Sequence, residues 1–216
     1  MAAVDTATGV ALIHVDAEGE NAITVIAGAN GHARATQVPD AALGPDTTLV
    51  LQLEVPIAEV AALASRAGGA RVILNAAPAA ALPDDLLRRL GTLIVNESEA
   101  LVLGTDLRLP TAPGAFANAA AARYHCTVVV TLGSRGAMAA RDGEQIAIAA
   151  PSMAVVDTTG AGDALVGAFA AALDRGAPLR QAVAEGVAAG SLACIGHGAR
   201  GDTPSRSAIA ALAATL

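Results

Sequence analysis

The sequence predicts an α/β protein with a doubly wound, mostly parallel sheet and helices on both of its faces. From residue 47 onward, short apolar runs alternate with helical stretches. These runs are apolar at nearly every position, which is typical of strands that are buried on both faces. Hydrophobic residues make up 54% of the 216 positions, enough to build one sizeable core.

The chain opens with two expected strands, which precede this α/β pattern. Residues 9–15 and 21–27 are apolar, rich in β-branched residues, and joined by the polar segment 16–20. This pattern predicts an antiparallel hairpin. We assign residues 1–30 to the hairpin and its entry strand, and residues 31–216 to the α/β core, inside which no linker or repeat indicates a further boundary.

Strands and helices then follow in order along the core. Buried strands are expected at 47–53, 70–74, 91–95 and 126–132, and helices at 57–67, 84–90, 97–103 and 114–124. A second hairpin is expected over 136–149, where the turn residues Asp142 and Gly143 separate two runs of small residues. The rest of the chain predicts helices at 161–173, 179–195 and 205–215, with Pro178 and Pro204 at helix starts.

Composition excludes several classes of function. The net charge of −7 argues against nucleic acid as a partner, because binding to phosphate backbones needs clustered cations. All 13 basic residues are arginine, and the missing lysine excludes P-loop NTPases, protein kinases and Schiff-base enzymes. Apolar runs are too short for a spanning helix and the opening residues are small and polar, so we expect no membrane association and a cytoplasmic location.

Cysteine and histidine give no sign of a metal centre. Cys126 and Cys194 lie far apart in apolar stretches, so we expect both to be core residues. The four histidines do not have the spacing of metal ligands, and ordinary structural roles are expected for them.

The strongest candidate site is the segment 157–163, Asp-Thr-Thr-Gly-Ala-Gly-Asp, which directly precedes a helical run. Backbone N–H groups can converge at Gly160, Ala161 and Gly162 without obstruction by side chains, and the positive end of the helix adds to the attraction for an anion. Asp163 beside a bound phosphoryl group could accept a proton from an attacking hydroxyl. The simpler alternative is that Asp163 only caps the helix.

This segment resembles the C-terminal signature of the ribokinase-like carbohydrate kinases, the PfkB family. Residues 8–13 (TGVALI), with Gly19-Glu20-Asn21 and Gly28-Ala29-Asn30, are similar to the family's early segments. Residues 96–99 (NESE) resemble its N-x-x-E motif, and residues 131–136 (TLGSRG) its nucleotide-side loop. Four matches in the family's order are hard to attribute to chance.

The resemblance implies an ATP-dependent kinase that transfers the γ-phosphate to the primary hydroxyl of ribose or a related pentose. Asp163 would be the general base and would contact the sugar, and the backbone at Gly160, Ala161 and Gly162 would form the anion hole. Glu54 would hydrogen-bond the sugar. Without the resemblance, we would expect it to be a solvated acid at the end of a strand. The hairpin within residues 1–30 would be part of a lid.

The resemblance also implies the positions of the nucleotide and the ions. Asn96, Thr131, Gly133 and Gly162 would contact ATP, and Glu99 would organise the water shell of Mg2+. Without the resemblance, Asn96 and Glu99 match a capping box. Thr131 and Gly133 would then simply lie where a strand ends and a turn begins. A monovalent cation, K+, would be held at Asp157, Thr159, Ala193, Gly196, Gly198 and Ser205.

The sequence also departs from the family pattern. No counterpart of the family's N-terminal block, with its Gly-Gly-Lys-Gly-x-Asn sugar loop, precedes Thr8. We therefore expect this polypeptide alone to bind nucleotide and to phosphorylate ribose poorly or not at all. Two alternatives stay open: a non-catalytic nucleotide-binding remnant, and a PfkB-family kinase for another sugar or a nucleoside. A homodimer also stays open, because the family often dimerises through its lid.

Overall fold

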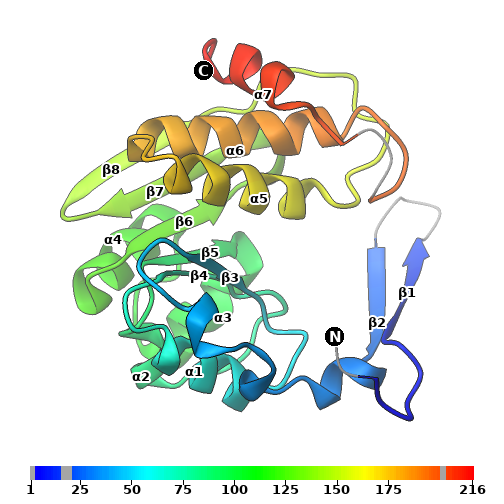
Figure 1. The fold of residues 1–216 in the computed structure, drawn as a ribbon. Helices are drawn as coiled ribbons and strands as arrows, with labels where there is room; N and C mark the ends of the chain where they lie inside the picture. Colours follow the sequence, from blue (N-terminus) through cyan, green and yellow to red (C-terminus); the bar gives the residue numbers. More distant parts are fainter. Residues whose placement is uncertain (1–2, 16–20, 200–202) are drawn as a thin grey trace.

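The predicted N-terminal hairpin is present in the computed structural model, which describes residues 3–15, 21–199 and 203–216. Strands β1 (Val10–Val15) and β2 (Asn21–Ile26) pair antiparallel, with Val10 opposite Ile26. The expected turn at 16–20 lies outside the described residues. The two strands stand at one side of the α/β body (Figure 1).

The main sheet has six strands, and they lie side by side in the order of the chain. The first four are parallel to one another, and the last two are antiparallel, which confirms the mostly parallel sheet. Because parallel strands end at the same edge, side chains that follow the first four strands meet there. The strands are β3 (Thr48–Leu51), β4 (Arg71–Asn75), β5 (Thr92–Asn96), β6 (Thr127–Thr131), β7 (Ala137–Arg141) and β8 (Glu144–Ile148).

Helices cover both faces of this sheet, as predicted (Figure 1). One face packs against α1 (Ile57–Arg66), α2 (Asp84–Leu87), α3 (Glu97–Leu107) and α4 (Pro113–Tyr124). The other face packs against α5 (Ala161–Asp174) and α6 (Leu179–Ala193), and α7 (Arg206–Ala213) lies on α6. No helix among the residues that the structure describes is long and apolar enough to cross a membrane.

The core is divided by the alternation of side chains along each buried strand. In β4, Ile73 faces α5 and α6, where Phe169 is buried, and Leu74 faces the first four helices, where Phe116 is buried. All four side chains are fully buried. Strands that are apolar on both faces therefore carry two separate hydrophobic clusters, as the continuous apolar runs predicted.

Helices α2, α3 and α7 differ by three residues or more from their expected lengths, and α7 spans Arg206–Ala213 instead of 205–215. We expected helix α3 to end at residue 103, before Gly104, but it continues to Leu107. Instead, Gly104 lets the following chain pass close by, since a Cβ there would lie 2.9 Å from the Pro110 carbonyl oxygen. Helix α2 ends at Leu87, three residues earlier than predicted, and the chain continues in tighter turns in which the Arg89 N–H donates to the Leu86 carbonyl at 2.9 Å.

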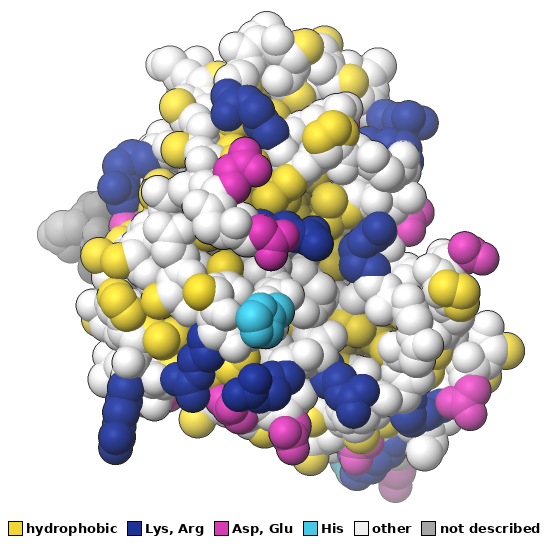
Figure 2. Space-filling model, turned by 90° about the vertical axis from the view of Figure 1, so that its left-hand side faces the viewer, with side chains coloured by type: hydrophobic (Ala, Val, Ile, Leu, Met, Phe, Trp, Pro, Cys, Tyr) yellow, Lys and Arg dark blue, Asp and Glu magenta, His cyan; other side chains and the backbone are white. Residues whose placement is uncertain are grey.

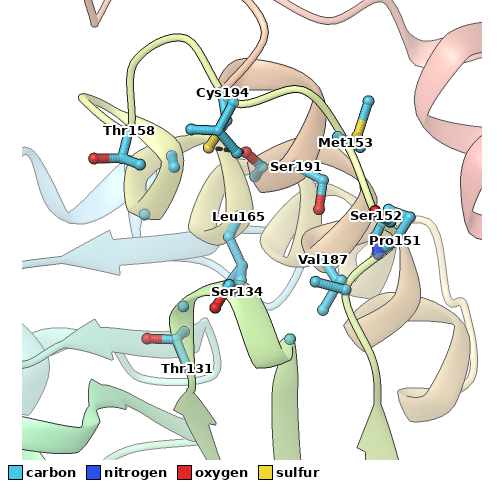
Figure 3. A pocket seen from close by; sticks show the side chains of 17 residues that line it. Thr131, Ser134, Pro151, Ser152, Met153, Thr158, Leu165, Val187, Ser191 and Cys194 are labelled. Carbon is cyan, nitrogen blue, oxygen red and sulfur yellow. Dashed lines mark hydrogen bonds between the residues drawn. The ribbon is translucent and has the colours of Figure 1, made fainter.

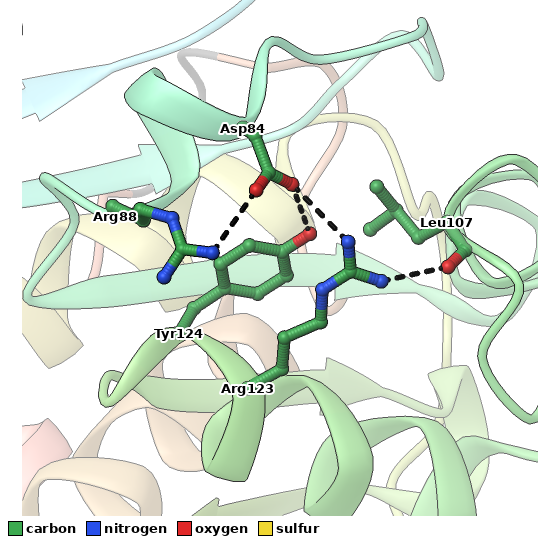
Figure 4. Close-up of polar contacts among 5 residues, drawn as sticks. All are labelled: Asp84, Arg88, Leu107, Arg123 and Tyr124. Carbon is green, nitrogen blue, oxygen red and sulfur yellow. Dashed lines mark hydrogen bonds and ion pairs between the residues drawn. The ribbon is translucent and has the colours of Figure 1, made fainter.

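A polar cluster ties α2 to the end of α4 (Figure 4). The Tyr124 hydroxyl donates to Asp84 at 2.8 Å, and the same carboxylate pairs with Arg88 at 3.2 Å and Arg123 at 3.4 Å. Both guanidinium groups lie within 6 Å of the tyrosine ring centre. Burial, with the bond to Asp84, raises the pKa of Tyr124 to about 12.

Charged side chains of both signs are mixed on the face shown in Figure 2. Ion pairs of the described chain join Arg88 to Asp84 and Arg141 to Asp142, each at 3.2 Å.

Candidate functional site

A cavity of about 520 Å³ lies at the carboxyl edge of the sheet, between the end of β6, the chain after β8, and helices α5 and α6 (Figure 3). Ligands of α/β proteins commonly bind at this edge. The wall contains four residues that we predicted, Thr131, Gly133, Ala161 and Gly162. The other lining residues are Ser134, Gly136, Ala150, Pro151, Ser152, Met153, Val155, Thr158, Leu165, Val187, Gly190, Ser191 and Cys194.

Helix α5 begins at the rim of this cavity because of a glycine with a left-handed backbone. Gly160 has φ 80° and ψ 0°, a conformation that costs little only for glycine. A Cβ at this position would also lie 3.0 Å from the Ala199 Cα. The Gly160 carbonyl accepts from the Ala164 N–H at 2.9 Å and so starts the helix.

The backbone amides at the start of α5, where we predicted an anion cradle, differ in their partners. The Ala161 N–H donates to the Thr158 carbonyl at 3.2 Å, so this amide already has a main-chain acceptor. Within the described residues, the N–H groups of Gly160, Gly162 and Asp163 have no main-chain acceptor. Three amides at the positive end of the helix thus stay available to an anion.

Asp163 lies in the first turn of α5 and is exposed. The alternative that it serves as a cap gains no support, because its carboxylate accepts no capping hydrogen bond from the described backbone and Gly160 occupies the cap position. Its neighbour Gly162 lines the cavity. Asp163 itself is not among the residues that line the cavity, and its side chain is exposed beside them.

The predicted cation residues Asp157, Thr159 and Gly198 come together. One oxygen of Asp157 accepts from the Thr159 N–H at 2.9 Å and from its hydroxyl at 2.7 Å, and the other accepts from the Gly198 N–H at 2.8 Å. These bonds lower the pKa of Asp157 to about 2. The carboxylate is therefore ionised at neutral pH and ties the loop before α5 to the turn after α6.

The other members of the predicted cation set are less closely tied to Asp157. Ala193 is the last residue of α6, and Gly196 lies in the turn that follows. Ser205 caps α7, where its hydroxyl accepts from the Ala208 N–H at 3.2 Å. No group of three or more His, Cys, Asp or Glu side chains gathers into a metal-binding cluster within the described part of the chain.

Asn96 and Glu99 form the capping box that was the alternative to a role with ligands. The Glu99 N–H donates to Asn96 Oδ1 at 2.8 Å, and the Asn96 N–H donates to Glu99 Oε2 at 2.7 Å. Burial raises the pKa of Glu99. Glu99 Oε1 has no hydrogen-bond partner among the described residues. Every fully buried side-chain oxygen in the described structure has a partner, so Glu99 Oε1 is in contact with solvent.

The remaining predicted residues lie at the carboxyl edge of the sheet. Thr131 ends β6, and Gly133 follows it in a short 3₁₀ turn. Glu54 is exposed and follows β3, and its N–H donates to Gln52 Oε1. Asn96 ends β5, between these two strands. Three strands of one parallel sheet therefore bring these residues to a common edge, and their contacts with ligands stay predictions.

Sequence reasoning missed the cavity wall that α6 supplies. Cys194 was expected in the core, but it is only half-buried and lines the cavity, where its Sγ donates to the Gly190 carbonyl at 3.2 Å. A Cβ on Gly190 would lie 3.0 Å from the Ala161 carbonyl oxygen, so this glycine allows α6 to approach the first turn of α5. Gly186 and Gly190, four residues apart, were the available signal for this close approach.

Known proteins resemble this chain over most of its length. The family described as pfkB family carbohydrate kinase matches residues 2–206. The chain is 34% identical over 207 residues to the ribokinase of Haemophilus influenzae, which covers 92% of this chain and 67% of that protein. The chain belongs to the PfkB family of carbohydrate kinases. The PfkB ribokinase of Staphylococcus aureus is 36% identical over 204 residues, with 91% of this chain and 67% of that protein covered.

Solved PfkB structures share the fold. The ribokinase of Thermotoga maritima superposes with a TM-score of 0.87 at 31% identity, over 97% of this chain and 70% of that chain. The ribokinase of Arabidopsis thaliana, solved with ribose and ATP, gives 0.82 at 30% identity and the same coverage. The chain thus spans about two thirds of the length of these PfkB relatives, which belong to a family of phosphotransferases.

Proposed function

We propose that this chain acts in an ATP-dependent sugar kinase that transfers the γ-phosphate to the primary hydroxyl of ribose or a related pentose. The observation that carries the proposal is the pairing of free amides at Gly162 and Asp163 with the exposed Asp163 carboxylate, next to a cavity. Relatives named ribokinase, one of them solved with ribose and ATP, support the choice of substrates.

The chemistry follows from this arrangement. The sugar hydroxyl oxygen attacks the γ-phosphorus while Asp163 accepts the hydroxyl proton, and the bond to the β-phosphate oxygen breaks to release ADP. A positioned general base of this kind contributes about 10²- to 10⁴-fold in rate. The N–H groups of Gly160, Gly162 and Asp163 stabilise the negative charge on the transferring group, and one such donor is worth about 10²- to 10³-fold.

The nucleotide would lie along the cavity, with its phosphates at the start of α5. Thr131 and Gly133 would contact it from the end of β6. Asn96 uses Oδ1 to cap α3, which leaves its Nδ2 donors for phosphate oxygens. Glu54, at the end of β3, would hydrogen-bond the sugar from the same edge of the sheet.

The residues present fit the two expected ions. Glu99 has one oxygen in contact with solvent, as a carboxylate needs if it holds Mg2+ through water, and this ion would neutralise phosphate charge. Asp157 is ionised and makes no salt bridge with a described arginine, so its charge suits K+. Thr159 and the backbone near Ala193, Gly196, Gly198 and Ser205 would complete that monovalent cation site.

The hairpin within residues 1–30 would be part of a lid over residues 31–216. Val10 and Ile26 are directly opposite on one face, and Leu12 lies on the same face. All three side chains are about half exposed, at 48–54%. This apolar face would cover the sugar or pair with a second copy in a homodimer, and analytical ultracentrifugation that finds only monomers would contradict the dimer.

The proposed reaction is tested by ADP release with and without ribose, in the wild type and in Asp163→Asn, together with calorimetric binding of ATP. We expect slow ribose-dependent release that Asp163→Asn abolishes, with ATP binding kept in both proteins. Absence of ATP binding, or ribose-dependent release that survives in Asp163→Asn, would contradict the proposal. Binding without any turnover in the wild type would favour the nucleotide-binding alternative, and release with a nucleoside but not ribose would favour another substrate.

A further inference from the structure

The side chains around the cavity share one chemical feature. None of the described lining residues is charged, aromatic, or a carboxamide such as Asn or Gln. The polar side chains are hydroxyls, together with the Cys194 thiol, and the rest of the wall is aliphatic or glycine. The site therefore has no side chain with a fixed set of donors or acceptors.

The part of the wall away from the start of α5 is where a nucleobase would lie. If the phosphates bind at the start of α5, near Gly162, the base reaches the side formed by Pro151, Met153 and Val187, which Figure 3 shows together with Ser152 and Ser191. Aliphatic side chains can pack against the flat faces of either purine ring system, because dispersion and burial need no particular donor or acceptor on the ring.

Hydroxyl groups do not distinguish the two purines either. Adenine presents a donor at position 6 and an acceptor at N1, and guanine presents the reverse. A serine hydroxyl rotates to donate or to accept, so Ser152 and Ser191 can bond to both patterns. A site rejects an analogue strongly only when a fixed buried group is left without its partner.

We infer that this pocket does not discriminate between adenine and guanine nucleotides, so that GTP serves as phosphoryl donor beside ATP. This inference rests on the proposed kinase function and concerns the donor that the same site takes.

The test measures binding of ADP and GDP to the whole chain by isothermal titration calorimetry with magnesium present. We expect dissociation constants within about fivefold of each other, a difference of about 1 kcal/mol or less. A preference for ADP above about thirtyfold, or about 2 kcal/mol, would overturn the inference and would assign the reading of the base to main-chain groups of residues 150–155. If neither nucleotide binds, the proposed kinase function fails and the inference fails with it.

Two variants examine the role of the hydroxyl. Ser191→Ala removes it, and Ser191→Cys keeps a side chain of similar size; circular dichroism melting shows whether each variant is folded. We expect each substitution to change the affinities for ADP and GDP by the same factor, within about threefold. A loss confined to one nucleotide would show that Ser191 reads the base and would overturn the inference. GTP-dependent turnover, compared with ATP-dependent turnover in the ribose assay, then extends the result from binding to transfer.

Discussion

Replacing Gly162 with alanine separates the anion-binding role of the α5 amides from the stability of the helix. A Cβ at Gly162 would have no protein atom within 4 Å, and the residue is helical. The substitution therefore causes no clash and reduces the conformational freedom of the unfolded chain. We expect the variant to fold and to gain up to about 1 kcal/mol in the free energy of unfolding.

The same substitution should weaken the binding of the phosphoryl group. Gly162 lines the cavity, so the added methyl group occupies space that a phosphoryl group needs to reach the Gly162 and Asp163 amides. Loss of one charge-assisted hydrogen bond is worth about 1.5–3 kcal/mol. At 1.36 kcal/mol per tenfold, turnover should fall by about 10- to 150-fold.

Gly167→Ala is the matched control, because Gly167 lies on the same helix, is exposed, and would also have free space around its Cβ. Thermal melting should show both variants to be at least as stable as the wild type. ADP release and calorimetric nucleotide binding should be impaired only in Gly162→Ala. If the two variants bind nucleotide equally tightly and turn over equally fast, the amides at the start of α5 do not hold the phosphoryl group.

Three further predictions address the loop, the polar cluster and the helix contact. The pKa of Asp157 is about 2 in the folded chain against an ordinary 3.8, so its stabilising effect is present above about pH 4 and is lost as the pH falls towards 2. Melting temperatures measured across this range should fall less in Asp157→Asn than in the wild type, and parallel curves would contradict the assignment. Tyr124 is the only tyrosine, so the absorbance of its tyrosinate can be followed alone, and its midpoint should lie near pH 12. In Asp84→Asn the midpoint should move towards 10. A wild-type midpoint near 10 would show that burial and the bond to Asp84 do not raise the pKa of Tyr124. Gly190→Ala should displace the Ala161 carbonyl, reduce stability by about 1–3 kcal/mol and weaken nucleotide binding, whereas unchanged binding would show that the α5–α6 contact does not position the site.

Local patterns predicted the strands and helices well, because each depends on neighbouring residues. The strand expected at 70–74 is Arg71–Asn75, and the helix expected at 161–173 is Ala161–Asp174. The 3₁₀ helices between residues 28 and 42 were not predicted, since they have no hydrophobic period. Helix α3 ends where Arg108 adopts a left-handed backbone with φ 55°, a conformation that the residue type arginine does not predict.

The same distinction applies to the candidate site. The grouping of Gly160, Gly162 and Asp163 at the start of α5 could be predicted because these residues are near one another in sequence. The bond from Ala161 to Thr158 depends on the shape of one turn, and residue types alone do not determine it. The wall from α6, with Cys194, is formed only when α6 packs against the preceding helix α5, and the residues that meet there lie on different helices. Residues brought together by such packing were therefore missed.

The central claim is that the amides opening α5 hold the transferring phosphoryl group beside the Asp163 carboxylate. The most direct measurement is a crystal structure of the chain with ADP, magnesium and aluminium fluoride, which stands in for that group. We predict fluoride atoms at hydrogen-bond distance, about 2.7–3.2 Å, from the N–H groups of Gly162 and Asp163. ADP and fluoride bound away from the start of α5, or an Asp163 side chain turned away from the fluoride, would contradict the account.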